Sequence, residues 1–423
     1  MLVKTIRHFL PGLSGLLRRL PDPRNPGQLY YPKETLVWSA LLMFLLALKS
    51  RRQFRFESEP PAFVANLNGL AGSRVETASH DDTVVYYLKS VAPEHFEMLP
   101  LYVVRRLIRM KALDRWRLQG AFLIAIDGTG QLFFGKRHCP HCLTRTGPDG
   151  RTVYFRNVLE AKLVTATGLA LSIATEFIEN VQPHADKQDC ELKAFARLAE
   201  KLRANFPRLP IILLGDTLYA CEPVFDICKR NRWHFIFTFK RGGLPAFFAE
   251  FEVLRDLAAN NRVTNRKGRI VQHFAWVNDM DYEGHTLSAF ECREQRPDGE
   301  HYFAWISDIR MGCRSVVTTS NQGGRLRWKI ENEGFNIQKN HGYELEHAYC
   351  SDQWAVKSLY SLLQLAHAIN QLMIHGSLLR PFHQLLGSLR NFLRQLARSF
   401  ATSAIAACHW RHAPATQIRL DSS

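Results

Sequence analysis

Two apolar runs, far apart in the chain, each lead into an aspartate. The stretch FLIAI precedes Asp127, and the stretch IILLG precedes Asp216. Such a run is typical of a strand that is buried on both faces. A carboxylate is costly to bury unless it is paired or binds a metal ion. Singly, each aspartate is also explained as a helix cap or a turn residue, but the repeated pattern favours a metal site.

The segments around the two aspartates alternate between strand and helix patterns. Branched and aromatic residues indicate strands, and apolar residues that recur every three or four positions indicate helices. In chain order, we expect strands at 121–126, 153–167 and 169–178, a helix at 190–206, a strand at 210–216, a helix at 222–232 and a strand at 233–240. This is the element order of the ribonuclease-H-like fold.

In such a sheet the first and fourth strands are neighbours, so Asp127 and Asp216 are expected side by side. Adjacent carboxylates repel each other unless a cation lies between them. Oxygen ligands select Mg²⁺ or Mn²⁺ over softer metals. Two such ions can activate a water molecule and stabilise the leaving oxygen of a phosphodiester. A third carboxylate is then expected from a later helix that packs on the sheet.

Composition indicates a globular protein with a polyanionic partner. The chain has 423 residues, of which 46% are hydrophobic, and lysine and arginine outnumber aspartate and glutamate to give a net charge of +16. An excess of this size suits nucleic acid, although a basic protein without such a partner is the simpler alternative. The apolar stretch Leu36–Leu48 is shorter than the roughly 20 residues of a membrane span, so we expect a buried helix there and no membrane partner.

The N-terminus and the cysteines favour a cytoplasmic protein. Early prolines and repeated arginines in the first 25 residues argue against a signal peptide. The nine cysteines are scattered, as in a reducing compartment.

We expect an α/β protein with a ribonuclease-H-like mixed sheet flanked by helices, a β-rich insertion and an N-terminal helical region. Three strand-like runs at 270–277, 285–292 and 301–309, separated by turn-prone residues, predict the insertion. The expected regions are a helical, DNA-binding part at 1–115, the first part of the core at 116–240, the insertion at 241–310, the final core helices at 311–380, and a C-terminal helical region and tail at 381–423.

The segment GRLRWKIENEGF, which begins at Gly324, supplies the third carboxylate. It places Glu331 four residues after Arg327. With Asp127 in AIDGTG and Asp216 in LLGDTLYA, these residues resemble the acidic triad of the DDE transposases of bacterial insertion sequences, in the IS-four-like branch with a β-rich insertion before the last acid. The resemblance extends over residues 120–375.

The resemblance implies a DNA transposase that binds the terminal inverted repeats of its element, cuts there and joins the freed 3′-hydroxyl to target DNA. It implies that Asp127, Asp216 and Glu331 hold two Mg²⁺ or Mn²⁺ ions. It also implies a homodimer in the active complex and a bacterial, cytoplasmic protein associated with the nucleoid. The basic residues expected to contact DNA are Arg325, Arg327, Lys329 and Lys339.

The chain departs from the family at two flanking positions. The family usually has a tyrosine three residues before its arginine, where this chain has Gly324, and a lysine seven residues after its glutamate, where this chain has Gln338 followed by Lys339.

Glu333 competes with Glu331 for the third position. On an α-helix, residues two apart point in different directions, so only one of them can face the sheet, and Ile330 is expected in the core. Arg327, one helical turn before Glu331, favours Glu331. Glu333 is then a supporting or solvated residue, and Gly334 marks close packing.

Two other functions share these features. A metal-dependent nuclease that does not join DNA ends would have the same acids. A DNA-binding protein without activity would gain nothing from carboxylates that face phosphates.

Further residues carry weaker signals. Cys139 and Cys142 form a C-x-x-C pair, which is half of a common zinc site; the alternative is a pair of thiols in a loop. Trp276 and Trp305 are candidates to stack on an unpaired base, but burial in the core of the insertion is the favoured explanation for them. Glu176 is a secondary candidate for the site, and we expect it to have a structural role or to support the metal ligands.

Asp189 precedes the helix expected at 190–206. We expect it to be the N-cap of that helix.

Overall fold

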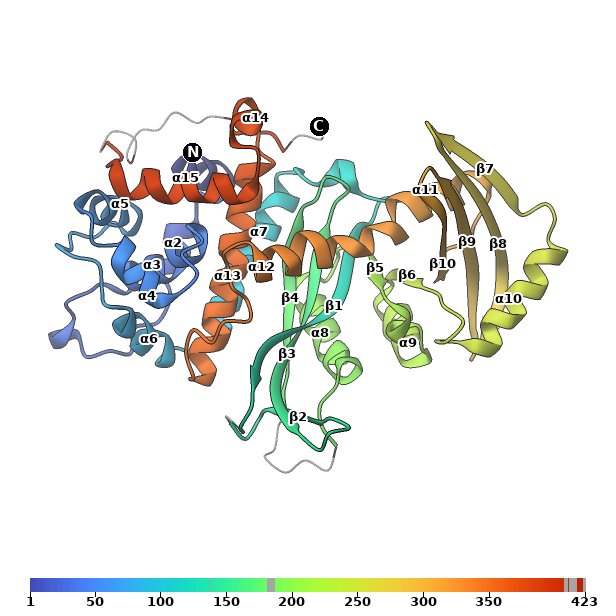
Figure 1. Ribbon diagram of the computed structural model, residues 1–423, viewed down its shortest axis with the longest axis horizontal. Coiled ribbons are helices and arrows are strands. Elements are labelled where there is room, and N and C mark those ends of the chain that lie inside the picture. Colours follow the sequence, from blue (N-terminus) through green and yellow to red (C-terminus); the bar gives the residue numbers. More distant parts are fainter. Residues whose placement is uncertain (138, 181–186, 407–409, 411–416, 421–423) are drawn as a thin grey trace.

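The computed structural model describes residues 1–137, 139–180, 187–406, 410 and 417–420. These residues form a mixed α/β structure in which an open sheet runs through the middle of the molecule and helices lie on both of its faces (Figure 1). The helices of the N-terminal part lie at one end of the molecule, and the β-rich insertion lies at the other end.

Ten strands of the described residues form this sheet, in the order β2–β3–β1–β5–β6–β10–β9–β8–β7, with β4 paired to β3. The pairs β1–β5 and β5–β6 are parallel, and the other pairs are antiparallel. The strands are β1 (Phe122–Phe134), β2 (Leu143–Thr146), β3 (Thr152–Val164), β4 (Ala170–Ile178), β5 (Ile211–Gly215), β6 (His234–Thr238), β7 (Arg262–Lys267), β8 (Ile270–Tyr282), β9 (His285–Arg296) and β10 (Gly299–Ser307).

The five strands predicted between residues 121 and 240 are present as β1, β3, β4, β5 and β6, and β5 lies beside β1 as expected. The predicted end of the first strand at Asp127 is wrong. β1 continues to Phe134 because β3 pairs with it as far as Tyr154, across an irregularity between Gly130 and Leu132. Asp127 therefore lies within a strand, whereas Asp216 directly follows β5.

The first 115 residues are mainly helical. The helix α3 contains most of the apolar stretch that begins at Leu36, and residues 35–45 are buried all round, which confirms the predicted buried helix. In the part of the chain that the structure describes, no helix has both the length and the apolar character needed to cross a membrane. The helices are α1 (Leu2–Phe9), α2 (Leu13–Arg18), α3 (Lys33–Leu45), α4 (Arg51–Glu57), α5 (Pro61–Ala71), α6 (Asp81–Lys89) and α7 (Glu94–Arg109).

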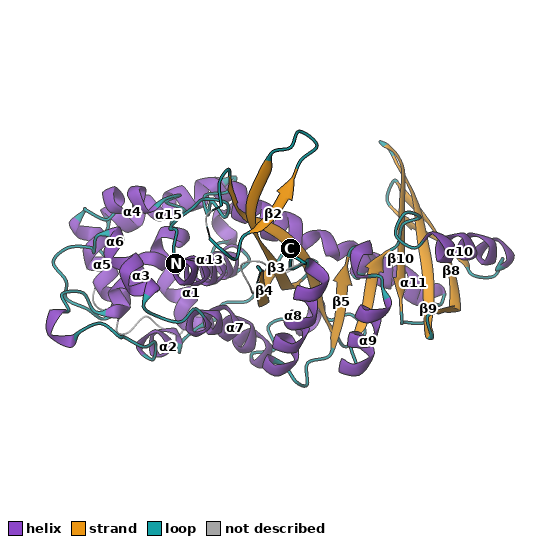
Figure 2. Cartoon of the chain, turned by 90° about the horizontal axis from the view of Figure 1, so that it is seen from below, coloured by secondary structure: helices purple, strands orange, loops and turns teal. Residues whose placement is uncertain are grey.

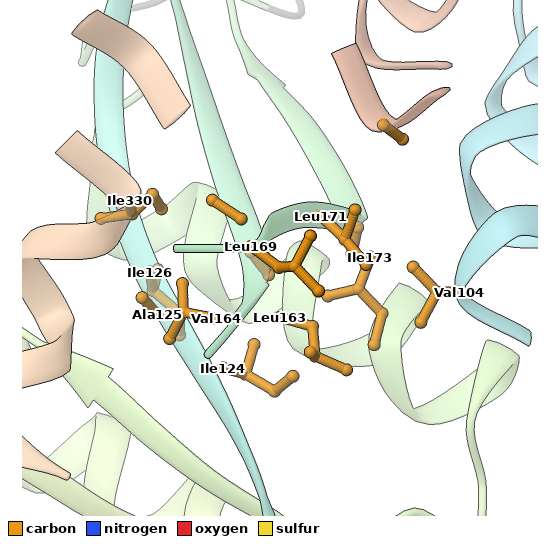
Figure 3. Packing of buried hydrophobic residues seen from close by; sticks show 14 of the residues in the cluster. Val104, Ile124, Ala125, Ile126, Leu163, Val164, Leu169, Leu171, Ile173 and Ile330 are labelled. Carbon is orange, nitrogen blue, oxygen red and sulfur yellow. The ribbon is translucent and has the colours of Figure 1, made fainter. Parts of the chain in front are cut away.

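The core joins these helices to the sheet. The long helix α13 (Gln353–Ile374) packs on α3, α7 and β4. Hydrophobic side chains of β1, β3 and β4 gather beside Val104 of α7, and Ile330 lies near Ile126 at the edge of this cluster (Figure 3). Ile330 is fully buried, as predicted, and it anchors the segment that carries Glu331.

The insertion extends the central sheet. Its three predicted strands are present as β8, β9 and β10, and β10 pairs with β6 from Trp305 to Ser307. The structure adds α10 (Pro245–Leu257) and the edge strand β7, which were not predicted. The sequence of β7, RVTNRK, is polar and mostly exposed, so it lacks the apolar alternation of a half-buried strand.

The helices of the core are α8 (Glu191–Asn205) and α9 (Glu222–Asn231), both where a helix was predicted. The prediction that Asp189 is the N-cap of α8 is wrong, because Cys190 holds that position. The carboxylate of Asp189 instead accepts a hydrogen bond from Arg197 at 2.6 Å.

The segment from Gly324 to Asn340 is not the single α-helix that was predicted. It begins as the 3₁₀ turn η4 (Gly324–Arg327) and continues as the π-helix η5 (Ile330–Asn336) and the short α12 (Ile337–Asn340). A Cβ atom on Gly334 would lie 3.2 Å from Lys162, so the absent side chain lets this wide turn approach β3. The remaining helices are α11 (Cys313–Gln322), η6 (Arg380–Phe382), α14 (His383–Leu386) and α15 (Leu389–Thr402).

Candidate active site

The parallel pairing of β1 with β5 brings Asp127 and Asp216 together. The last register pair is Ala125 with Leu214, so each aspartate lies two residues beyond it and at the same level. Asp216 also caps a short turn, because its Oδ1 accepts a hydrogen bond from the backbone N–H of Leu218 at 2.9 Å. The cap interpretation of Asp216 and its place beside Asp127 are therefore both correct.

Glu331 reaches the same place from η5. Arg327 joins it to the sheet: the Nη1 of Arg327 lies 2.8 Å from Oε1 of Glu331 and 3.7 Å from Oδ2 of Asp127. The ion pair across four residues is the one expected from the sequence. The structure thus brings all three predicted acids into one cluster, with one arginine between two of them.

The cluster contains more carboxylates than cationic side chains. Burial is the main reason that the pKa of Asp127 is raised to about 7; of the neighbouring charges, Arg327 has the largest effect and lowers the pKa, whereas Glu331, Asp216 and Glu191 raise it. A carboxylate in this position stabilises an added cation, because the protein has placed more negative than positive charge around it.

Glu191 is a fourth carboxylate of this cluster, and the sequence analysis missed it. It begins α8, its Oε2 accepts a hydrogen bond from the hydroxyl of Tyr219 at 3.3 Å, and burial and Asp216 raise its pKa. The only signal in the sequence was its position in the first turn of the helix that follows the third core strand, which does not distinguish it from an ordinary first-turn glutamate.

The other predicted basic residues pair with nearby acids. Arg325 is held by Glu294 at 2.6 Å and lies over the ring of Phe303, whereas Lys329 pairs with Glu333 at 3.0 Å. Lys339 forms its ion pair with Glu346, at 2.7 Å, rather than with one of the predicted acids. Arg327 is therefore the predicted basic residue that touches the predicted acids.

The two departures from the family pattern have structural explanations. A Cβ atom on Gly324 would lie 2.3 Å from Nε1 of Trp305, so this indole fills the space that a larger residue would need. Gln338 is fully buried, and its amide hydrogen-bonds Gln364 and His367 of α13. A lysine at position 338 would bury its charge in this network.

A cleft of about 980 Å³ begins at the acid cluster and extends to the insertion. Asp216 and Arg327 line one end of the cleft, and Tyr302 of β10 also lines the cleft. Seven basic side chains line the cleft: Lys240, Arg241, Arg255, Arg293, Arg296, Arg325 and Arg327. Two acidic side chains, Asp216 and Glu252, are part of the lining. The six arginines form ion pairs with Glu252, Glu291, Glu294 or Glu331, which neutralise part of the basic charge, and among the lining residues Lys240 adds a further positive charge.

The two tryptophans of the insertion that were candidates for base stacking are buried. Trp276 and Trp305 are each 3% exposed and pack in the core of the insertion, which confirms the alternative explanation for them. Trp305 and Trp328 both line the cleft, and Trp328, which follows Arg327, is 51% exposed.

Glu176 is structural, as expected. It is buried and pairs with Arg197 at 2.6 Å and Lys201 at 2.8 Å.

The cysteine pair lies in the segment between β1 and β2, beside Arg156 of β3. The Sγ atoms of Cys139 and Cys142 are 3.0 Å apart, and the guanidinium of Arg156 donates to Cys139 at 3.1 Å. His138 lies outside the described residues. Zinc at this pair stays a prediction, and elemental analysis of reduced, chelator-free protein tests it.

A second group of potential ligands, at the start of α6, does not join the site. Among the described residues, His80, Asp81 and Asp82 are the one group of three whose ligand atoms lie within 4.8 Å of one another, so the side chains of the acid cluster around Asp127 would have to move closer together for three of them to share one ion. His80 and Asp82 are exposed.

The acid cluster fits a divalent cation by the chemistry of its donors. Asp127, Asp216, Glu331 and Glu191 offer hard carboxylate oxygens, which suit Mg²⁺ or Mn²⁺, and Arg327 contacts Asp127 and Glu331. Comparison with protein-family models and with curated protein sequences gives no match for this chain.

Proposed function

We propose that the chain is a metal-dependent polynucleotidyl transferase with a ribonuclease-H-like core. The observation that carries this proposal is the convergence of Asp127, Asp216 and Glu331, which come from two neighbouring strands and a distant π-helix, at the end of a basic cleft. Carboxylates beside an anion-binding cleft suit an enzyme that acts on phosphodiesters, since the acids hold the metal and the basic residues hold the substrate.

Within this class, we propose a DDE transposase of an insertion sequence. The order of the three acids along the chain, the arginine four residues before the glutamate and the β-rich insertion between β6 and α11 support it. Such an enzyme would bind the two ends of its element, which favours a homodimer in the active complex.

Asp127, Asp216 and Glu331 would hold two Mg²⁺ or Mn²⁺ ions, which supply a nucleophile at neutral pH and stabilise the leaving oxygen. The protein prepares these side chains before any ion binds. Arg327 fixes the carboxylate of Glu331 near Asp127, and the backbone N–H of Leu218 orients Asp216. Rigid placement of ligands lowers the entropy cost of forming the transition state.

The cleft would hold DNA next to these acids. Lys240 and Arg241 lie just beyond the end of β6 at Thr238, and Trp328 offers an exposed ring beside Arg327. Phosphates would bind the basic lining, and an exposed aromatic ring can stack on a base where the duplex opens.

Incubation of the full chain with DNA that flanks its own coding sequence and a second plasmid, in Mg²⁺, tests the proposal. Strand-resolved gels should show nicks or breaks at two inverted repeats and covalent joining of 3′ ends to the plasmid. Cleavage without joining would identify a nuclease, and binding without any cleavage would identify a DNA-binding protein without activity. Omission of the divalent cation should abolish every covalent product.

A further inference from the structure

The two cysteines between β1 and β2 lie in a projecting part of the molecule. The far ends of β1 and β3, together with β2, extend beyond the rest of the sheet (Figures 1 and 2). The backbone N–H of Cys142 donates to the carbonyl oxygen of Cys139 at 3.4 Å, and the two Sγ atoms are 3.0 Å apart. This turn aims the two thiols at each other, and an approach of about 1 Å would bring them to the length of a disulfide bond.

The two thiols differ in their access to solvent. Cys139 is partly exposed, whereas Cys142 is completely buried. The side-chain amide of Asn180 donates to the carbonyl oxygen of Cys142 at 3.2 Å, and its backbone N–H donates to that of His141 at 3.0 Å. Cys142 is therefore held from behind, and Cys139 is the thiol that a reagent in solvent reaches first.

A buried guanidinium lies beside the accessible thiol. Arg156 of β3 is 4% exposed, and its Nη2 donates to the Sγ of Cys139 at 3.1 Å. The groups that act on the charge of Arg156 are the two cysteines, and among the residues that the structure describes its Nε has no hydrogen-bond partner. A buried charge is costly without a counter-ion. The thiolate of Cys139 is the anion that the structure offers to this arginine.

The pKa values of the two thiols are shifted in opposite directions. Burial raises the pKa of Cys139, but the hydrogen bonds from Cys142 and Arg156 lower this pKa by more, so that it lies below its usual value. Burial and the hydrogen bond to Cys139 raise the pKa of Cys142. The pair therefore favours a thiolate at Cys139 and a thiol at Cys142. An accessible thiolate beside a second thiol is the arrangement that thiol–disulfide exchange uses.

This environment suits exchange better than it suits zinc. A structural zinc site takes four ligands. Within the described part of the chain, no His, Cys, Asp or Glu side chain joins the two thiols in a group of three whose ligand atoms lie within 4.8 Å of one another. The guanidinium of Arg156 also lies against Cys139, and it would repel a second cation there.

We propose that Cys139 and Cys142 form a redox-active dithiol, which exchanges with low-molecular-weight disulfides such as oxidised glutathione. The Cys139 thiolate attacks one sulfur of the disulfide, forms a mixed disulfide and releases one glutathione thiolate. Cys142 gives up its proton to that thiolate, attacks the Sγ of Cys139 and releases the second glutathione as a thiolate. Two electrons pass from the protein to glutathione, and one protein disulfide forms. This inference does not depend on the proposed function, and its test needs no DNA.

Differential alkylation of the full-length protein, treated with a chelator and equilibrated with reduced and oxidised glutathione, tests the proposal. Peptide mass spectrometry measures the oxidised fraction of each cysteine. Cys139 and Cys142 should oxidise together, as one disulfide within a single tryptic peptide, at ratios that leave the exposed Cys313 reduced. In Cys142→Ser, Cys139 should stop at the mixed disulfide with glutathione. Cys313→Ser is the matched control and should leave the pair unchanged.

Arg156→Met should have two effects that a purely structural role of Arg156 would not produce together. The thiolate loses its counter-ion, so alkylation of Cys139 at pH 7 should slow by about threefold or more. The reduced form loses the same stabilisation, so the disulfide fraction at a fixed glutathione ratio should rise. Arg156→Lys keeps the charge and should restore part of both effects. Faster alkylation of both thiols in Arg156→Met would show that the arginine only holds the loop closed.

Two results would overturn the inference. Separate mixed disulfides on Cys139 and Cys142, or a pair that stays reduced where Cys313 is oxidised, would show that the two thiols do not act together. Zinc that purifies with the protein at one ion per chain, and that is absent from Cys142→Ser, would assign the pair to a metal site instead.

Discussion

At Asp127, burial and three neighbouring carboxylates outweigh the one arginine that contacts it. Asp127→Asn and Asp216→Asn should each lower DNA cleavage in Mg²⁺ by several orders of magnitude, because positioning of the metal supplies most of the rate. DNA binding should remain or become tighter, since a negative charge near phosphate is removed. Strand cleavage on gels and a gel-shift titration measure the two effects, and near-normal cleavage by either variant rules out the two-metal site.

The two glutamates of η5 have different partners, which gives them different expected roles. Glu331 pairs with Arg327 beside Asp127, and Glu333 pairs with Lys329. Glu331→Gln should abolish cleavage, whereas Glu333→Gln should keep at least a substantial part of it, at fixed Mg²⁺ in the same gel assay. The reverse result would assign the third metal ligand to Glu333.

The raised pKa of Asp127 makes the stability of the metal-free protein depend on pH. Between about pH 4 and pH 7 the folded protein binds a proton at Asp127 that the unfolded chain releases, since the pKa rises from 3.8 to about 7 on folding. This residue's contribution to stability is therefore complete below about pH 4 and is lost as the pH rises through 7. The Tm of Asp127→Asn relative to the unaltered protein should increase over that range, and a constant difference in Tm would contradict the assignment.

The sequence was sufficient to find the residues whose positions depend on strand pattern, and insufficient for those that depend on packing. Asp127 and Asp216 follow from apolar runs, and Glu331 follows from its spacing to Arg327. Glu191 joins the cluster only because Gly128 lacks a side chain and Tyr219 turns back toward α8. Neither condition leaves a periodic signal in the sequence.

Among the predicted boundaries of helices and strands, the wrong ones are those that depend on contact with a neighbouring element. β1 extends past Asp127 because β3 pairs with it. The segment around Glu331 is a 3₁₀ turn followed by a π-helix, in which Gly324 lies close to Trp305 and Gly334 lies close to Lys162. Hydrophobic spacing predicts that a helix exists, but it does not distinguish these three kinds of turn.

The contact between η4 and β10 predicts a cost for a side chain at Gly324. In Gly324→Ala, the methyl group would lie 2.3 Å from the rigid indole of Trp305, so the free energy of unfolding should fall by about 1–3 kcal/mol. Urea unfolding followed by tryptophan fluorescence measures it. Gly15→Ala, in α2 with no atom within 4 Å of the added carbon, is the control and should be neutral or slightly stabilising. Equal stability of the two variants would show that η4 moves freely away from β10.

For the whole molecule, the net charge of +16 and the basic cleft predict binding of DNA that weakens steeply with salt. For 6–10 phosphate contacts, affinity should fall by about 10³–10⁵ between about 50 and 200 mM salt. Lys240→Met should reduce the slope of log K against log salt by about one. Lys193→Met, on α8 and outside the cleft lining, should leave the slope unchanged. Fluorescence anisotropy measures these slopes, and an affinity that is independent of salt would remove the cleft as the DNA site.

The pairing of β10 with β6 has a mechanical consequence. β10 adds the strands of the insertion to β6, which pairs with β5, and Asp216 follows β5. If DNA binds along the cleft as proposed, a force on the hairpins of the insertion would reach β5 through continuous ladders of backbone hydrogen bonds. The insertion would then transmit the strain of a deformed substrate to the strand that leads into Asp216.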